Sequence, residues 1–327
     1  MIANQHILVA ALDWGNGHQS RSTALINQLL DAQNVVEIAC SSDQIEYWKT
    51  TFPKLKAHCI LPDNKITWSK AGPLHLFLRF STFKRNWKLE KEAIDELCKN
   101  KRFDLIVSDN RYGVRHSRIK SVLLTHQLRL GYSGFLGILG KWMISKLTKP
   151  FHEIWIPDIS QSPRLSGKLS QSEWITQPVQ FIGPLTPKVP TEVSANEVVL
   201  VLLSGPEPQR SAFAKCCINA LKTTPNKVVI AGECQIENSN PTISLLGNIS
   251  VQESMRLQAC HKIILCRSGY TTLMELHRLN KKAILIPTPG QIEQTYLAKY
   301  WNAKFHYPTC RQKELTSQKI DLLLSQL

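Results

Sequence analysis

Short apolar runs alternate with longer stretches of mixed polarity along the whole chain. In the first half the apolar runs are His6–Leu12, Val35–Cys40, Phe103–Ser108, Ser121–Leu124, Glu153–Pro157 and Gln180–Ile182. The stretches between them, for instance Arg21–Leu30, have the length and apolar spacing of helices. Apolar strands that alternate with helices are typical of a parallel sheet covered by helices on both faces. The pattern therefore predicts an α/β fold.

The alternation restarts after a proline-rich segment. Three prolines lie within Gly183–Pro190, and proline continues neither a helix nor a central strand. The apolar runs of the second half are Val198–Leu203, Val228–Ala231, Ile263–Cys266 and Ala283–Ile286, and a last helix is expected at about Lys313–Leu324. A chain of 327 residues accommodates two α/β units of about 150 residues each. We predict an N-terminal domain over residues 1–188 and a C-terminal domain over residues 189–327.

The most informative segments are two successive strand-to-helix turns in the second half. The strand that ends at Cys266 leads into Arg267–Glu275 (RSGYTTLME), and the strand that ends at Ile286 leads into Pro287–Gln294 (PTPGQIEQ). In an open α/β sheet, ligands bind beyond the carboxyl ends of the strands, where helix N-termini offer free N–H groups to phosphate. These turns therefore predict a phosphate site.

Three side chains in these turns are suited to bind the ribose and the sugar of a nucleotide sugar. The Glu275 carboxylate could accept hydrogen bonds from a ribose diol, and Glu293 and Gln294 could bind sugar hydroxyls. A plain Rossmann-like unit, in which Ser and Thr only cap a helix, is the alternative interpretation of the same residues.

The spacing of Arg267-Ser268-Gly269, Glu275 and the Glu293-Gln294 doublet resembles the donor half of the GT-B glycosyltransferases. The branch most similar to it is glycosyltransferase family 28, typified by a peptidoglycan enzyme that adds N-acetylglucosamine to a lipid-linked acceptor. The resemblance implies two Rossmann-like domains whose parallel sheets face each other across a cleft, with a last helix that could pack back onto the first domain. It implies a UDP-sugar donor, here with an N-acetylhexosamine as the expected sugar. It assigns donor contacts to Ser268, Gly269, Thr271, Thr272, Glu275, Glu293 and Gln294. Our further candidates for binding the donor are Gly17, Ser204, Gly205, Arg210, Arg267 and Gln291. The family usually has Gln-Gln, so Glu293 leaves the identity of the sugar open.

A glycine-rich turn follows the first apolar run. Gly15 and Gly17 allow a tight turn and a close approach to a ligand, and His18 follows them at the start of a helix. The turn resembles the Gly-His loop of the same family and would face the cleft. An imidazole can deprotonate an acceptor hydroxyl, because it titrates near neutral pH. We therefore predict that His18 is the catalytic base, with Asp13 as a second candidate and helix capping as the alternative role of His18.

The corresponding turn of the second half, Leu203–Arg210, departs from the family. Pro206 and Pro208 stand where glycines are expected, which stiffens the turn and removes amide donors. Arg210 could compensate with a charge-assisted contact to the diphosphate, or it could be an ordinary surface arginine.

Two further polar clusters follow strands of the first half. Their members Asp109, Arg111, His126 and Gln127 are our candidates for binding the acceptor. Capping of strand ends would explain part of this set equally well.

The reaction predicted from these features is direct displacement with inversion at the anomeric carbon. The chain has no Asp-x-Asp signature, so we expect no metal, and no cofactor besides the UDP-sugar co-substrate. The GxGHxxR pattern of Gly15, Gly17, His18 and Arg21 also resembles UDP-sugar hydrolases of nonulosonate biosynthesis, in which the histidine activates water. A nucleotide-sensing or scaffold protein is a third interpretation.

Positive charge is concentrated in the first half. The net charge is +15, and residues 1–188 hold 25 Lys and Arg against 15 Asp and Glu. No nucleic-acid-binding signature accompanies this charge, so we expect no nucleic acid partner. Two segments, Pro73–Lys91 and Leu128–Lys149, combine cations with aromatic and aliphatic residues. A helix of this kind can lie on an anionic membrane surface or can be a core helix with solvent-directed lysines.

These features predict where the protein works. The sequence shows no secretory signal at its start, and its nine cysteines lack a C-x-x-C pair, as expected for reduced core residues. We expect a cytoplasmic protein that is peripheral on the inner face of the cytoplasmic membrane and that acts on a lipid-linked or envelope glycan acceptor.

Overall fold

The structure is a computed structural model that describes residues 2–12, 16–61, 80–129, 134–190 and 196–326. The chain divides into two compact units. The N-terminal unit comprises Met1–Trp14 and Arg21–Leu185, and the C-terminal unit comprises Gly15–Ser20 and Thr186–Leu327. The division after Leu185 lies within the proline-rich segment.

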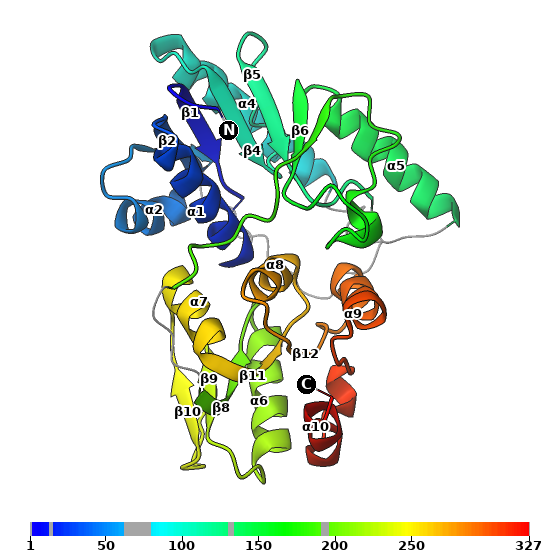
Figure 1. The fold of residues 1–327 in the computed structure, drawn as a ribbon. Coiled ribbons are helices and arrows are strands. Elements are labelled where there is room, and N and C mark those ends of the chain that lie inside the picture. The colour runs from blue at the N-terminus through cyan, green and yellow to red at the C-terminus, as the bar shows by residue number, and fades with distance from the viewer. Residues whose placement is uncertain (1, 13–15, 62–79, 130–133, 191–195, 327) are drawn as a thin grey trace. The chain divides into compact units, whose positions relative to one another are not determined.

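The N-terminal unit is built on a seven-stranded parallel sheet with the order β3-β2-β1-β4-β5-β6-β7 (Figure 1). Its strands are β1 (His6–Ala10), β2 (Val35–Ser41), β3 (Ala57–Leu61), β4 (Leu105–Asp109), β5 (Lys120–Leu124), β6 (Glu153–Ile156) and β7 (Val179–Phe181). Its α-helices in the described residues include α1 (Asn16–Asp31), whose first turn belongs to the other unit, α2 (Ile45–Thr51), α4 (Phe80–Asn100) and α5 (Gly134–Thr148).

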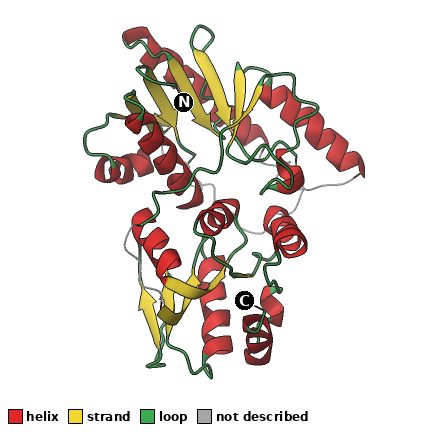
Figure 2. Cartoon of the chain, viewed as in Figure 1, coloured by secondary structure: helices red, strands yellow, loops and turns green. Residues whose placement is uncertain are grey.

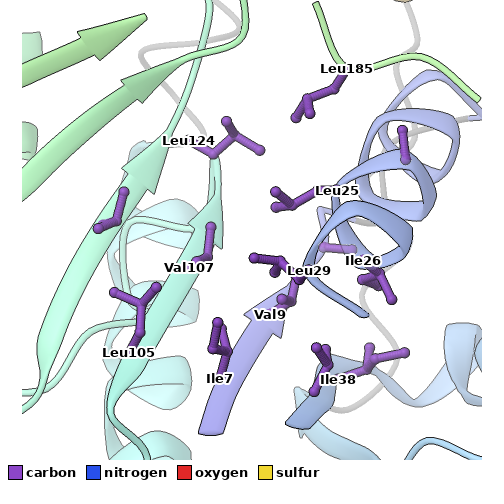
Figure 3. Close-up of a cluster of buried hydrophobic side chains, with 14 of the residues drawn as sticks. Ile7, Val9, Leu25, Ile26, Leu29, Ile38, Leu105, Val107, Leu124 and Leu185 are labelled. Atoms are coloured by element: carbon purple, nitrogen blue, oxygen red, sulfur yellow. The ribbon is translucent and has the colours of Figure 1, made fainter. Parts of the chain in front are cut away.

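Strand β1 shows why these runs are apolar throughout. Ile7 and Val9 pack in a core cluster with Leu25 and Leu29 of α1 (Figure 3). Leu8 and Ala10 point to the other face, into a cluster that includes Ile94 of α4. Helices therefore cover both faces of this sheet, as the pattern predicted (Figure 2).

The C-terminal unit has a five-stranded parallel sheet with the order β10-β9-β8-β11-β12. Its strands are β8 (Asn196–Leu202), β9 (Val228–Ala231), β10 (Ile243–Leu246), β11 (His261–Cys266) and β12 (Ile284–Leu285). Its α-helices in the described residues include α6 (Gln209–Leu221), α7 (Val251–Cys260), α8 (Tyr270–Arg278), α9 (Ile292–Phe305) and α10 (Ser317–Leu324). The α/β fold with two parallel sheets confirms the predicted fold class.

The last helix differs from its expected form. A short 3-10 helix at Gln312–Glu314 precedes α10, which begins only after Thr316, whose side chain accepts a hydrogen bond from the Lys319 amide. Ile320 and Leu323 of α10 are buried in the core cluster of the C-terminal unit, and α10 contacts α6. The apolar side of this helix is therefore covered within its own unit.

Candidate functional site

Two helices of the C-terminal unit begin just beyond the carboxyl ends of neighbouring strands. Strands β11 and β12 pair in parallel, α8 follows the first strand, and α9 follows the second. The N-cap residues of the two helices, Gly269 and Gln291, make no side-chain capping hydrogen bond. Thr271 and Thr272 lie in the first turn of α8, and Glu293 lies in the first turn of α9, all three partly exposed. Both predicted turns are thus present, and each opens a helix whose N-cap residue forms no capping bond with its own side chain.

Hydrogen bonds join the two turns to each other. The Ser268 hydroxyl donates to the carbonyl oxygen of Gln294 over 2.8 Å. The Gln294 side chain accepts from the Thr288 amide over 2.8 Å, within the second turn. Because Ser268 is fully buried, its hydroxyl serves the turn itself. The two helix N-termini are therefore held as one structural element.

Arg267 is buried beneath both turns. Its guanidinium donates to the carbonyl oxygens of Ile286 and Pro287, at 3.2 and 3.3 Å, and to the side chain of Gln312 at 2.7 Å. It also lies 3.9 Å from the centre of the Phe213 ring. Burial lowers the pKa of Arg267 to about 10. We expected Arg267 to contact the donor, whereas the structure directs its side chain to the backbone that shapes the turns.

Glu275 lies in α8 and is almost completely buried. Its Oε1 accepts a hydrogen bond from the Ser20 hydroxyl at 2.7 Å, and its Oε2 accepts one from Gln258 Nε2 at 2.8 Å. Burial raises the pKa of Glu275, and these two hydrogen bonds counteract the rise only in part. The predicted ribose ligand is thus a carboxylate that is already held by two neutral donors.

The turn after β8 leads into α6. Gly205 has a φ of +93°, which suits glycine, and α6 begins four residues later at Gln209. Ser204, before it, is partly exposed. Arg210 pairs with Glu207 at 3.2 Å and with Glu233 at 3.4 Å. The cation expected on the diphosphate is therefore already paired with two carboxylates of its own unit.

Asp109 of the N-terminal unit belongs to a buried polar network. The Arg21 guanidinium pairs with its carboxylate through Nε and Nη2, and the Ser22 hydroxyl donates to Oδ2 at 3.0 Å. Arg21 Nη1 lies 2.9 Å from Nδ1 of His126. Because arginine can only donate, Nδ1 of His126 must be the acceptor of this bond.

Arg111 lies in a second buried ion pair. Its Nη1 donates to Glu90 at 2.7 Å, and its Nε donates to the carbonyl oxygen of Ala11 at 2.6 Å. Of the four acceptor candidates, Asp109 and Arg111 are almost fully buried, and His126 is 6% exposed. Only Gln127 is partly exposed. The structure therefore gives Asp109 and Arg111 partners in the interior, and their role toward an acceptor stays a prediction.

The glycine-rich turn is described only in part. Asp13 lies outside the described residues, whereas Gly17 and His18 lie in the first turn of α1, with His18 partly exposed. Residues Gly15–Ser20 group with the C-terminal unit, which also carries the two donor turns.

Several polar residues of these networks were not found from the sequence. Ser20, Glu90, Asp158 and Gln258 were not among our candidates, and Arg21 appeared only in the hydrolase pattern. Asp158 is fully buried and accepts hydrogen bonds from the amides of Leu165 and Ser166 at 3.0 and 2.8 Å. Gln258 could have been noticed as a polar residue inside the apolar sequence Leu257–Cys260.

The surface of α5 combines exposed apolar and cationic side chains. Ile138, Leu139 and Trp142 are 67%, 48% and 56% exposed, and Lys146 lies over the Trp142 ring at 3.9 Å. A neighbouring groove of about 470 Å³ has five cationic lining residues, Lys84, Lys88, Lys91, Arg115 and Lys146, and one acidic one, Glu92. None of the helices in the described part of the chain is long and apolar enough to cross a membrane.

Comparison with solved structures places this fold among the GT-B glycosyltransferases. The kitacinnamycin glycosyltransferase superposes with a TM-score of 0.72 and 13% identity, over 100% of this chain and 91% of that one. UGT89C1 of Arabidopsis thaliana complexed with UDP-L-rhamnose gives 0.69 and 13%, over 99% and 90%. MurG of Acinetobacter baumannii gives 0.57 and 15%, over 98% and 90%. A search of curated protein sequences gives no match.

These likenesses show that the chain has a GT-B fold. Residues 226–327, which include the turns that open α8 and α9, match the glycosyltransferase family 28 C-terminal domain. The fold and this match together identify the protein as a glycosyltransferase.

Proposed function

We propose that this glycosyltransferase moves a sugar, with an N-acetylhexosamine as the expected one, from a UDP-sugar to a lipid-linked or envelope glycan acceptor. The observation that carries the proposal is the pair of joined turns of α8 and α9, which place two helix N-termini at one edge of the sheet, neither of them capped by the side chain of its N-cap residue. Such N-termini bind phosphate through backbone N–H groups and the helix dipole. The UDP-L-rhamnose complex of UGT89C1 supports a UDP-sugar donor. The lipid-linked or envelope acceptor is what the resemblance of the sequence motifs to family 28 implies.

The proposed chemistry is an inverting displacement that needs no metal ion. The helix N-termini would stabilise the departing diphosphate by fixed dipoles and N–H groups. His18 would remove the proton of the acceptor hydroxyl as it attacks the anomeric carbon, without a covalent intermediate. The family match and the similar structures described above are all glycosyltransferases, so the UDP-sugar hydrolase alternative gains no support from them.

Binding and turnover test this proposal separately. A thermal-shift and calorimetric screen of UDP, GDP and dTDP should give tight binding of UDP alone. A transferase should release UDP from a UDP-sugar only when an acceptor is present. Release at the same rate without any acceptor would identify a hydrolase. His18→Ala should lower turnover by about two to four decades. His277→Ala, which changes an exposed histidine of α8, is the control, and near-wild-type turnover of the His18 variant would remove His18 from the mechanism.

We further propose that the exposed surface of α5 binds an anionic membrane from the cytoplasmic side. Each engaged Lys or Arg adds about 1 kcal/mol near an anionic leaflet, in addition to the burial of Trp142 and Ile138. The protein should co-sediment with vesicles that contain anionic lipid, and salt should weaken the binding. Replacing Trp142 and Ile138 together by Ser should reduce it strongly. Equal binding to neutral and anionic vesicles, or no binding to either kind, would contradict the proposal that this surface binds an anionic membrane.

A further inference from the structure

The two hydrogen-bond donors of Glu275 have no role in the reaction as proposed so far. Ser20, Gln258 and Glu275 all belong to the C-terminal unit, and the three residues are 5%, 0% and 6% exposed. Each donor takes a different carboxylate oxygen, at 2.7 Å from Ser20 and 2.8 Å from Gln258. The carboxylate is therefore fixed at both oxygens.

These contacts keep a buried carboxylate able to accept hydrogen bonds. An ionised carboxylate offers about four lone-pair positions, two on each oxygen, whereas a protonated one loses acceptor capacity and gains a donor. Burial favours the protonated form, and donors to the carboxylate favour the ionised one. With one lone pair of each oxygen used by Ser20 and Gln258, one remains on each. Two remaining acceptors on one carboxylate match the two neighbouring hydroxyls of a ribose.

The orientation of the Gln258 side-chain amide depends on its hydrogen bond to Glu275. Its Nε2 donates to Glu275 and lies 3.4 Å from the Ser254 hydroxyl, while its Oε1 is buried without a hydrogen bond in the described structure. A flipped amide would turn that oxygen toward the Glu275 carboxylate, which is repulsive. The neighbouring residues Leu257, Ala259 and Cys260 are buried and apolar. A glutamine at this position is therefore explained by the carboxylate that it holds.

We propose that Gln258 and Ser20 are positioning residues that present both oxygens of Glu275 to the 2′- and 3′-hydroxyls of the donor ribose. They thereby set a preference for ribonucleotide over deoxyribonucleotide. This inference rests on the proposed UDP-sugar function and names the side chains that give its nucleotide site this specificity.

Calorimetric titration of the full chain with UDP and with 2′-deoxy-UDP tests the inference. The wild type should bind UDP about tenfold or more tightly than the deoxy form, because a hydrogen bond to a charged group is lost. Gln258→Leu and Ser20→Ala should each weaken UDP binding and bring this ratio toward one. Ser20→Thr, which keeps the hydroxyl, should preserve the ratio. Ser22→Ala is the matched control, because Ser22 is a buried serine of the same helix that donates to Asp109 instead.

The pH dependence of binding gives a second readout that a purely structural role would not change. Loss of the Gln258 donor raises the pKa of Glu275 further. As the pH is lowered, Glu275 of the Gln258→Leu variant should therefore be protonated, and UDP affinity lost, at a higher pH than in the wild type. The affinity for 2′-deoxy-UDP should change less with pH.

The outcomes of these experiments distinguish failure of this inference from failure of the proposed function. Failure of the wild type to bind UDP would overturn the proposed function. Equal binding of UDP and 2′-deoxy-UDP by the wild type would overturn the ribose role of Glu275 and this inference with it. A wild type that discriminates, with Ser20→Ala and Gln258→Leu keeping the same ratio, would overturn the inference alone. Should Gln258→Leu not fold, the ratio measured for Ser20→Ala decides.

Discussion

Removal of the Asp109 carboxylate should destabilise the N-terminal unit strongly. Asp109 and Arg21 are 0% and 1% exposed, so Asp109→Ala leaves a buried guanidinium without its carboxylate. Breaking a buried ion pair from one side costs about 3–5 kcal/mol. The Ser22 hydroxyl, which donates to Asp109 at 3.0 Å, also loses its acceptor, which adds about 1 kcal/mol. The double variant Asp109→Leu, Arg21→Met should recover most of the loss, because no buried charge remains.

Tryptophan emission during urea unfolding measures this loss of stability in the N-terminal unit. Seven of the eight tryptophans lie within residues 1–185, so the signal reports mainly the N-terminal unit. Glu96→Ala is the control, because Glu96 forms an ion pair with Lys99 at 2.5 Å on the exposed surface of α4. Such a pair contributes little, so this variant should unfold like the wild type. The reasoning is refuted if Asp109→Ala loses less than about 1 kcal/mol.

Three further changes have expected outcomes. Burial raises the pKa of Glu37, but hydrogen bonds from Lys101 and His58 outweigh this and lower it below its ordinary value of 4.5. The stability that ionised Glu37 contributes relative to Glu37→Gln should therefore be fully present above pH 4.5 and be lost as the pH falls through the lowered pKa, as measured by urea titration at several pH values. The raised pKa of Glu275 has the opposite sign, so Glu275→Gln should be more stable than the wild type at neutral and higher pH, with no difference in acid, although it loses UDP binding. Arg267→Lys keeps the charge but not the forked geometry, so calorimetry should show weaker UDP binding together with a lower unfolding temperature.

Apolar runs predicted the central strands well because these strands are buried on both faces. Strand β1 is the simplest case, since Ile7 to Ala10 are all fully buried. The edge strands β3 (Ala57–Leu61) and β10 (Ile243–Leu246) were missed. Each is partly exposed, so its sequence mixes polar and apolar residues and lacks a continuous run. Their positions depend on pairing with β2 and β9, which no local pattern contains.

The donor turns could be located from sequence, but the contacts of their side chains could not. The position of Gly269 and of Gln291 at helix starts follows from local rules for strand ends and helix beginnings. The burial of Arg267 under both turns depends on Gln312 and on Pro287, which are distant in sequence. Likewise, the contact of Gln258 with Glu275 joins two helices whose side chains meet only in the folded unit.

The two units use polar residues at the ends of strands in different ways. In the C-terminal unit, the side chains of Arg267 and Ser268 support the turns by donating to backbone carbonyl oxygens of Ile286 and Gln294. In the N-terminal unit, Asp109 and Arg111 are themselves the buried partners of internal ion pairs. A ligand could reach either of them only by breaking a buried pair, which costs more than one new hydrogen bond returns. Of the four predicted acceptor residues, Gln127 is the one that is only partly buried, so we expect it to be the most accessible of them to a ligand.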